Sequence, residues 1–280
     1  MNITHPSLQG IVQKSFVVLV VLLALLSLVP LYFGVLTSFK PSSSGGAVSL
    51  IPENLTLDNY KYLFTRTRIL RWFFNSLFTS TLAAAIIVYL SALAGYPLAK
   101  KKFPGVKWLF WIIIVFMTIP KEALLLPLFM MMKEYHLFNT YYGIILPALA
   151  WPFAVFLMKQ FISTIPSDLF DAAEIDGCGP LRLFHSILLP IIKPALGALS
   201  IFAFVYVWND YIWQLIVITS LEMKTLPLGV AGLQEQSASD AVNYGQLMAG
   251  STLGAIPLLA VFLFFQKYFT SGITMGAVKG

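Results

Sequence analysis

The stretch PSDLFDAAEIDGCGPLRLFHSILLPIIKP, residues 166–194, is the longest run in the second half of the chain that is not uniformly apolar. Ser167 stands where a helix N-cap is expected. Asp168 and Asp171 follow in the first turn, where the helix dipole favours negative charge. Gly177 is placed to end this helix in a left-handed conformation. The stretch therefore begins with a short, self-capped helix.

A second short helix is expected after Gly179 and Pro180, because proline suits the first position of a helix. Pro190 and Pro194 should limit or kink it. Ala172 and Ala173, in the first helix, are too small to anchor a core but allow another protein to approach the backbone closely. We therefore expect 166–194 to form a helical elbow between two membrane spans, with a surface suited to docking.

The composition excludes a soluble globular protein. The chain has 280 residues, 58% of them hydrophobic and 11% charged, and its mean hydropathy is +0.82. Charged residues make up about a quarter of ordinary soluble domains. A single polytopic membrane domain, 1–280, is expected. The lone cysteine, Cys178, excludes an intrachain disulfide and a cysteine cage, and the three histidines are too far apart to suggest zinc, so no metal site is expected.

Six apolar runs are long enough to predict membrane spans. They cover 15–37, 72–99, 108–132, 141–158, 195–221 and 247–265. Four lysines, Lys100, Lys101, Lys102 and Lys107, crowd the short loop after the second run, which should therefore be cytoplasmic. Both termini are then cytoplasmic, on the same side as the elbow.

The first outer loop, 38–71, is net positive, although basic residues are usually more frequent in cytoplasmic loops than in outer ones. Its basic residues are Lys40, Lys61, Arg66, Arg68 and Arg71. Two readings stay open: these charges attract an acidic saccharide or an acidic partner protein, or the arginines anchor the second span among lipid headgroups.

Ionisable residues within two spans are candidates for a transport path. Lys121 and Glu122 interrupt the third run, unless they mark the end of a shorter helix. Trp208, Asn209, Asp210 and Tyr211 lie close to the middle of the fifth run, and we expect Trp208 and Tyr211 to share one helix face. The predicted path residues are Trp208, Asn209, Asp210, Tyr211 and Glu122.

The run Asp171-Ala172-Ala173-Glu174-Ile175-Asp176-Gly177, with Phe184 and Pro190 behind it, resembles the signature of membrane-spanning permease subunits of ATP-binding-cassette importers. That signature is Glu-Ala-Ala, three residues, Gly, and a later Phe and Pro. Asp171 replaces the usual Glu, and Cys178 the usual Ala. The resemblance implies that the elbow couples to an ATPase subunit. The residues concerned are Asp171, Ala172, Ala173, Asp176, Gly177, Phe184 and Pro190.

Further pieces resemble the carbohydrate-type importers, in particular the smaller permease of maltose-type systems. They are Asn75-Ser76-Leu77, Lys102-Phe103-Pro104-Gly105, Trp208-Asn209-Asp210, Thr225-Leu226-Pro227-Leu228-Gly229 and Gly276-Ala277-Val278-Lys279-Gly280. The resemblance implies an all-α, six-span type I importer permease fold with a core region at 72–267. It also implies that the loop 222–246, through Thr225, Pro227 and Gly229, contacts a solute-binding protein, and that the tail 266–280, through Val278 and Lys279, contacts the ATPases.

The implied partners are a second homologous permease, two ATPase subunits, an extracytoplasmic solute-binding protein, a saccharide and membrane lipid, with no nucleic acid. The expected location is a bacterial or archaeal cytoplasmic membrane. Because the chain lacks a phosphate-binding loop of the GxxxxGK[ST] type, we expect no enzymatic activity and no cofactor on it, with ATP and Mg²⁺ on the partner ATPases. The alternatives are a permease for a non-sugar solute, such as a phosphorylated compound, an amino acid or an anion, and a secondary transporter. If the chain is a permease, the alternative to a role of Asp210 in the transport path is a hydrogen bond from this residue's side chain to the second permease.

Overall fold

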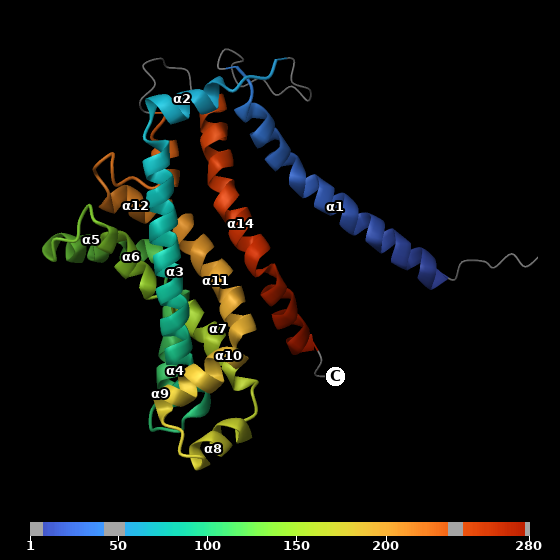
Figure 1. Ribbon diagram of the computed structural model, residues 1–280, viewed down its shortest axis with the longest axis vertical. Coiled ribbons are helices and arrows are strands. Elements are labelled where there is room, and N and C mark those ends of the chain that lie inside the picture. The colour runs from blue at the N-terminus through green and yellow to red at the C-terminus, as the bar shows by residue number, and fades with distance from the viewer. Residues whose placement is uncertain (1–7, 42–53, 235–242, 278–280) are drawn as a thin grey trace, which may run out of the picture. The chain divides into compact units, whose positions relative to one another are not determined.

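The structure is a computed structural model that describes residues 8–41, 54–234 and 243–277. Within these ranges the chain forms helices and no β-strand (Figure 1). Three helices are long and apolar enough to cross a membrane, and six spans result when each of three bent helix pairs is counted as one. The predicted all-α, six-span architecture is confirmed, and the chain is a multi-pass membrane protein.

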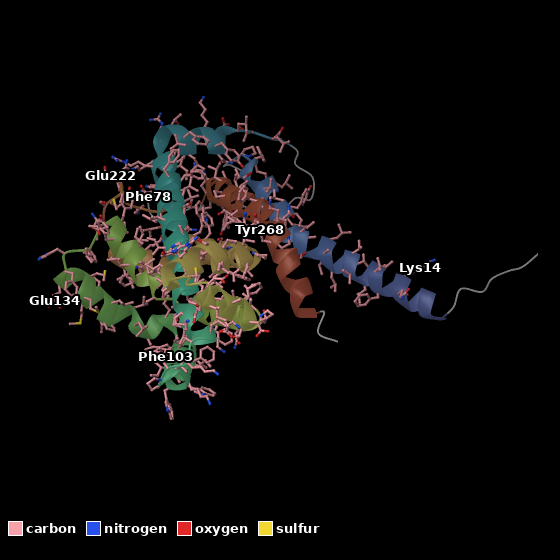
Figure 2. The ribbon with its side chains drawn as sticks, turned by 60° about the horizontal axis from the view of Figure 1, so that its bottom comes forward. Lys14, Phe78, Phe103, Glu134, Glu222 and Tyr268 are labelled. Atoms are coloured by element: carbon pink, nitrogen blue, oxygen red, sulfur yellow. The ribbon has the colours of Figure 1, made fainter. Side chains whose placement is uncertain are left out.

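Contacts divide the chain into two compact units, one of Met1–Thr67 and Val230–Leu253, the other of Arg68–Gly229 and Gly254–Gly280. In the first unit, α1 (Leu8–Ser38) confirms the first predicted span. Figure 2 shows side chains projecting from several sides of this helix, and none of its most apolar window is buried, although Ser38 at its end is. A helix that is apolar all round and uncovered is suited to lipid or to another membrane protein.

In the same unit, α2 (Asp58–Arg66) is fastened to the end of α1 by one amide. Asn59 Nδ2 donates to the carbonyl oxygens of Ser38 at 2.9 Å and Lys40 at 2.7 Å. A Cβ added at Gly245 would lie 2.5 Å from Asn59 Nδ2, so glycine is needed there. Lys40 is buried, which removes it from any exposed basic surface on the first outer loop.

The second unit is built around α3 (Ile69–Lys100), which confirms the second predicted span. It packs against α6 (Tyr141–Leu149), α7 (Pro152–Ser163) and α11 (Lys193–Trp208) (Figure 1). The buried face of α3 is rich in small residues: Ser76, Thr79, Ser80, Ala83, Ala84, Ser91, Ala92 and Gly95. Small residues let helix backbones approach closely, which is how helices associate where the solvent is as apolar as the side chains.

Three of the predicted spans are bent pairs. The third is α4 (Val106–Thr118) followed by η2 (Lys121–Leu124) and α5 (Leu125–Glu134), with a bend of 95°. The fourth is α6 and α7, bent by 43° ahead of Pro152. In the last pair, α11 follows α9 (Pro180–Arg182), η3 (Leu183–Leu188) and α10 (Leu189–Ile191) at 81°. Proline accounts for these bends because it lacks an N–H and restricts the residue before it.

Two boundaries differ from the sequence prediction. The fifth span was expected to continue to residue 221, but α11 ends at Trp208 and a separate helix, α12 (Tyr211–Val217), follows. The sixth helix, α14 (Tyr244–Ala277), continues beyond the predicted 247–265. Most of the predicted tail 266–280 is therefore helical, and residues 278–280 lie outside the described part. That the chain acts as one domain with a core at 72–267 stays a prediction.

The contact between α3 and α7 gives a test of the fold. A Cβ at Gly95 would lie 2.9 Å from the Lys159 nitrogen, a backbone atom that cannot move aside cheaply. We expect Gly95→Ala to separate the two helices and to destabilise the protein by about 1 to 3 kcal/mol. The measurement is thermal unfolding of the purified chain in detergent. Gly179→Ala is the control, since nothing lies within 4 Å of its added Cβ; equal midpoints for the two variants would contradict the prediction.

Candidate functional site

Two broken helices meet in the second unit, and the first break lies between α4 and η2. Ile119 and Pro120 are extended, with ψ angles of 118° and 136°. The cause is local, because a proline pushes the residue before it out of the helical region. The sharp turn that follows places Lys121 and Glu122 at the start of the next helix. Of the two readings of this pair, the structure supports the one in which it follows the end of a shorter helix.

The second break lies at Asn209 and Asp210, between α11 and α12. Asn and Asp are weak helix formers because their side chains compete with the backbone for hydrogen bonds. The break exposes carbonyl groups at the end of α11, and Gln214 Nε2 donates to one of them, that of Val207, at 3.3 Å. The Asp210 carboxylate does not cap α12, so it is free to bond elsewhere.

Lys121 and Asp210 join the two breaks as an ion pair. The Asp210 side chain is 11% exposed and that of Lys121 is 31% exposed. A carboxylate so far from water needs a counter-charge. Lys121 Nζ also lies 5.0 Å above the centre of the Tyr206 ring, and that ring is stacked on Trp151 at 4.5 Å. Because this stack leaves no room for an ammonium group between the rings, Lys121 covers the other face of Tyr206.

A cavity of about 620 Å³ opens beside the ion pair. This volume lies within the range of about 300 to 1,000 Å³ typical of small-molecule sites. Its lining comes from η2, α5, α11, α12 and the second break: Lys121, Glu122, Leu125, Val205, Tyr206, Asn209, Asp210, Tyr211, Ile212 and Trp213. The cavity combines charged groups, one amide and aromatic rings, so it can hydrogen-bond a polar solute and cover its apolar faces.

Four of the five predicted path residues, Glu122, Asn209, Asp210 and Tyr211, line this cavity. Trp208 does not: it is 2% exposed, stacked on Phe204 and packed edge-on against Phe73. The expectation that Trp208 and Tyr211 share a helix face is wrong, because the helix breaks between them.

Sequence reasoning missed the contribution of Tyr206 and the pairing of Lys121 with Asp210. A signal was present, since each of these charges lies beside a residue that disfavours helix continuation.

The elbow contains the predicted first helix, α8 (Asp168–Ile175), with Asp168 and Asp171 in its first turn. Ser167 precedes it, but its hydroxyl makes no capping hydrogen bond, which corrects the prediction of a side-chain cap. Gly177 has φ of +75°, as predicted. The Cys178 N–H donates to the Ala173 carbonyl at 2.9 Å, and the Gly177 N–H to the Glu174 carbonyl at 3.0 Å. This pair of bonds is a Schellman motif, which requires the left-handed residue.

The elbow lies at the end of the unit beyond α3 (Figure 1), and it exposes small and apolar groups. Ala172 is exposed, Ile175 is 85% exposed and Leu181 is 71% exposed. Ala173 and Phe184 face inward and are buried. After α9 the chain forms η3, a π-helical segment, before Pro190 and Pro194 turn it into α11.

Contacts with the C-terminal end of α3 fix the position of the elbow. Phe170 is buried against Tyr96, with ring centres 5.8 Å apart. Lys100 donates to the Ile165 carbonyl, and Lys101 pairs with Glu174. The pKa of Lys101 is raised, first because Glu174 accepts its hydrogen bond. Because the pKa of Lys101 is raised, the pair with Glu174 contributes fully to stability through neutral pH. That contribution is lost only as the pH rises through the raised pKa.

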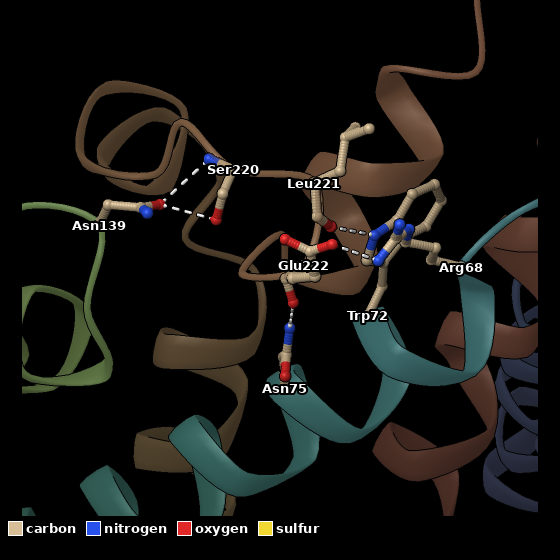
Figure 3. A network of polar contacts seen from close by, with 7 residues as sticks. All are labelled: Arg68, Trp72, Asn75, Asn139, Ser220, Leu221 and Glu222. Carbon is tan, nitrogen blue, oxygen red and sulfur yellow. Dashed lines mark hydrogen bonds and ion pairs between the residues drawn. The ribbon is translucent and has the colours of Figure 1, made fainter.

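A second polar network holds the segment after α12 against the start of α3 (Figure 3). Trp72 Nε1 donates to the Leu221 carbonyl at 2.8 Å. Asn75 Nδ2 donates to the carbonyls of Glu222 at 2.7 Å and Lys224 at 2.8 Å. Arg68 pairs with the Glu222 carboxylate, with both side chains more than half exposed. The segment is therefore fixed mainly through its backbone.

From the other side, Asn139 Oδ1 accepts hydrogen bonds from the Thr219 N–H, the Ser220 N–H and the Ser220 hydroxyl, each at 3.1 Å. Asn139 itself has φ of +55°, a conformation that asparagine tolerates better than most residues. The segment 218–224 is thus held on both sides.

The residues predicted to contact a binding protein lie close to this network. Thr225 is fully buried and bonds Gln214. Gly229 is buried against Trp72, whose ring atoms would lie 2.2 Å from an added Cβ. Direct contact through these two residues does not fit the structure, which assigns them to packing, while Pro227 is partly exposed. Residues 235–242 of the same loop lie outside the described part, as do Val278 and Lys279 of the tail.

Residues 87–275 match the family described as "Binding-protein-dependent transport system inner membrane component". The chain belongs to this family. The match includes the elbow and both helix breaks, so the geometry described above is that of a transport permease.

Three curated relatives cover nearly the whole permease. The arabinooligosaccharides transport system permease protein AraQ of Bacillus subtilis is 37% identical, over 99% of each chain. The trehalose transport system permease protein SugB of Mycobacterium tuberculosis is 32% identical, over 91% of this chain and 93% of its own. The lactose transport system permease protein LacG of Rhizobium radiobacter is 30% identical, over the full length of both.

The fold is shared with a solved structure. One chain of a bacterial ABC transporter involved in the import of the acidic polysaccharide alginate aligns with a TM-score of 0.82. The alignment covers 96% of the permease and 100% of that chain, at 20% identity. This likeness shows the fold and confirms the predicted importer permease architecture.

The ion pair yields a prediction for the site. Lys121→Met leaves the Asp210 carboxylate largely buried without a counter-charge, so we expect a loss of roughly 1 to 3 kcal/mol in the free energy of unfolding. Asp210→Asn should cost less, because the Lys121 ammonium keeps its contacts with Tyr206 and water. The double variant should cost less than the sum of the single ones. Denaturant unfolding in detergent measures this double-mutant cycle; strict additivity would show that the pair does not interact.

Proposed function

We propose that the chain is a permease subunit forming half of the translocation path of an ATP-driven saccharide importer. Family membership establishes transport, and curated relatives are named for arabinooligosaccharides, trehalose and lactose. In this proposal the solute passes the cavity at the two helix breaks, where Glu122, Asn209, Asp210 and Tyr211 meet it. The permease provides the path and performs no reaction of its own.

One observation carries the link to ATP: the elbow 166–194, whose first helix is closed by the Schellman motif at Gly177, exposes small and apolar groups. Ala172, Ile175 and Leu181 are exposed, whereas Phe170 and Phe184 are buried and hold the elbow to its own unit. A short helix attached in this way moves as one body with the spans behind it. We infer that it docks in a cleft of an ATPase subunit, which binds the ATP and Mg²⁺.

The remaining partners in the proposal are a second homologous permease, a second ATPase and an extracytoplasmic solute-binding protein. The second permease provides the other half of the path. The loop 222–246 reaches the binding protein through residues beyond the fixed segment 218–224, and the tail around Val278 and Lys279 reaches the ATPases. Lipid and the second permease cover the apolar surface of α1.

The proposed orientation follows from charge. The lysines at 100–102 and 107 lie at the end of α3 where the elbow is, and short basic loops favour the cytoplasmic side. The elbow and both termini are then cytoplasmic in a bacterial or archaeal cytoplasmic membrane. A permease for a non-sugar solute is the alternative, and it would share the elbow but not the preference for sugars.

Two substitutions in the elbow test the coupling. Ala172→Arg places a bulky charge on the exposed docking surface. Gly177→Val forces a β-branched residue to φ of +75°, which costs on the order of 1 kcal/mol or more. Both variants should assemble with the second permease yet lose ATP hydrolysis stimulated by the loaded binding protein, by about tenfold or more. The measurement is the ATPase rate of the purified complex in liposomes.

Matched controls separate coupling from misfolding. Gly177→Asn should retain most activity because asparagine tolerates the left-handed region, and Ala172→Ser keeps the side chain small. If the Arg and Val variants hold the ATPase and show undiminished stimulation, the elbow is not the coupling element.

A further inference from the structure

The charges lining the cavity are unequal. Of the described residues around it, one is basic, Lys121, and two are acidic, Glu122 and Asp210. One basic and two acidic residues give the lining a formal net charge of −1. The basic residue, Lys121, is already in contact with both Asp210 and the Tyr206 ring.

An anionic solute would meet this site at a disadvantage. To bind Lys121, a carboxylate would have to displace Asp210 and leave a carboxylate that is 11% exposed without its partner. It would also approach Glu122, which is exposed beside the cavity. Like charges at this range repel, and a displaced buried charge is costly.

A neutral polyol has no such conflict. Its hydroxyls can donate to the Asp210 and Glu122 carboxylates and both donate to and accept from the Asn209 amide. The ring of Tyr211 lines the same cavity and is 37% exposed, so it offers apolar surface to the C–H groups of a sugar. Each component of the lining thus has a counterpart in an uncharged saccharide.

We propose that this cavity is a subsite for neutral saccharides, and that Lys121, Asp210 and Glu122 make it reject acidic ones. The proposal rests on the saccharide import proposed above and defines its substrate class. A permease of the same fold belongs to a transporter involved in importing an acidic polysaccharide, so the fold by itself does not exclude charged substrates.

Thiol chemistry measures the charge of the cavity without depending on the binding protein. Asn209→Cys is introduced together with Cys178→Ser, and the complete importer is purified in detergent. The rates of reaction with a cationic and an anionic methanethiosulfonate of similar size are then compared. We expect the cationic reagent to react about threefold to tenfold faster, relative to their rates with a free thiol. Adding Glu122→Gln should bring the ratio close to one.

The control is Ile175→Cys in the same Cys178→Ser background. This position is 85% exposed on the elbow and is outside the cavity lining. Its ratio of rates should not respond to Glu122→Gln. A response there would mean that the substitution acts on the whole protein, which would contradict a local charge effect.

Protection by sugars tests the substrate class. Arabinotriose, trehalose and lactose are offered as neutral probes, and lactobionate and trigalacturonate as acidic ones. At least one neutral probe should slow the reaction of the cysteine at position 209, and neither acidic probe should. The proposal is overturned if that cysteine reacts with no reagent, if the anionic reagent reacts as fast as the cationic one, if no neutral probe protects, or if an acidic probe protects. Saccharide uptake by the intact importer in liposomes is scored separately, so failure of the subsite is distinguishable from failure of the proposed function.

Discussion

Close packing along α3 is the contact on which the second unit depends. In a bilayer, lipid is as apolar as the side chains, so helices associate through backbone proximity and small polar groups. The buried face of α3 has small residues from Ser76 to Gly95, and at Gly95 an added Cβ would come within 2.9 Å of the α7 backbone. One end of this helix holds the outer segment through Trp72 and Asn75. The other end holds the elbow through Lys101. Both assemblies are therefore attached to the same rigid rod.

The helix breaks carry a second constraint. Every interrupted helix leaves backbone groups without partners, and such groups are costly away from water. In this protein side chains from nearby elements add bonds to such carbonyls. Gln214 donates to the Val207 carbonyl, which also accepts the Asp210 N–H at 3.3 Å. Trp213 Nε1 donates at 2.9 Å to the Gly143 carbonyl, whose usual helical donor position is taken by Pro147. Broken helices are tolerated at membrane depth only where they line a cavity or are covered by protein. The cavity beside Lys121 and Asp210 meets the first condition, so the breaks and the candidate site have one physical origin.

The sequence predicted those features that depend on local chemistry. The elbow is set by residues within one or two turns of each other: acidic residues occupy the first turn of α8, Gly177 ends α8 at positive φ, and Pro180 begins α9. Spans follow from length and apolar content alone.

The break at Asn209 escaped prediction because an apolar average over about 19 residues is insensitive to two polar residues. The placement of Trp208 was wrong for the same reason. The partners of Asn75 could not be inferred either, since the Glu222 carbonyl lies 147 residues away in sequence. Thr225 and Gly229 were read as accessible from their position in a polar loop, whereas their burial depends on Gln214 and Trp72.

The π-helical segment η3 at Leu183–Leu188 affects how the chain can vary in length. A π turn accommodates one more residue than an α turn without interrupting the helix. Because the wide turn absorbs that residue, the segments on either side of it keep about the register of an uninterrupted α-helix. Leu188 and Ile192, both fully buried, should therefore still face the interior after a single-residue deletion here, and α11 should leave Pro194 in the same direction. The same deletion in an ordinary α-helix would rotate everything beyond it by about 100°, so the π segment is where the chain between the elbow and the cavity can lose one residue at the smallest structural cost.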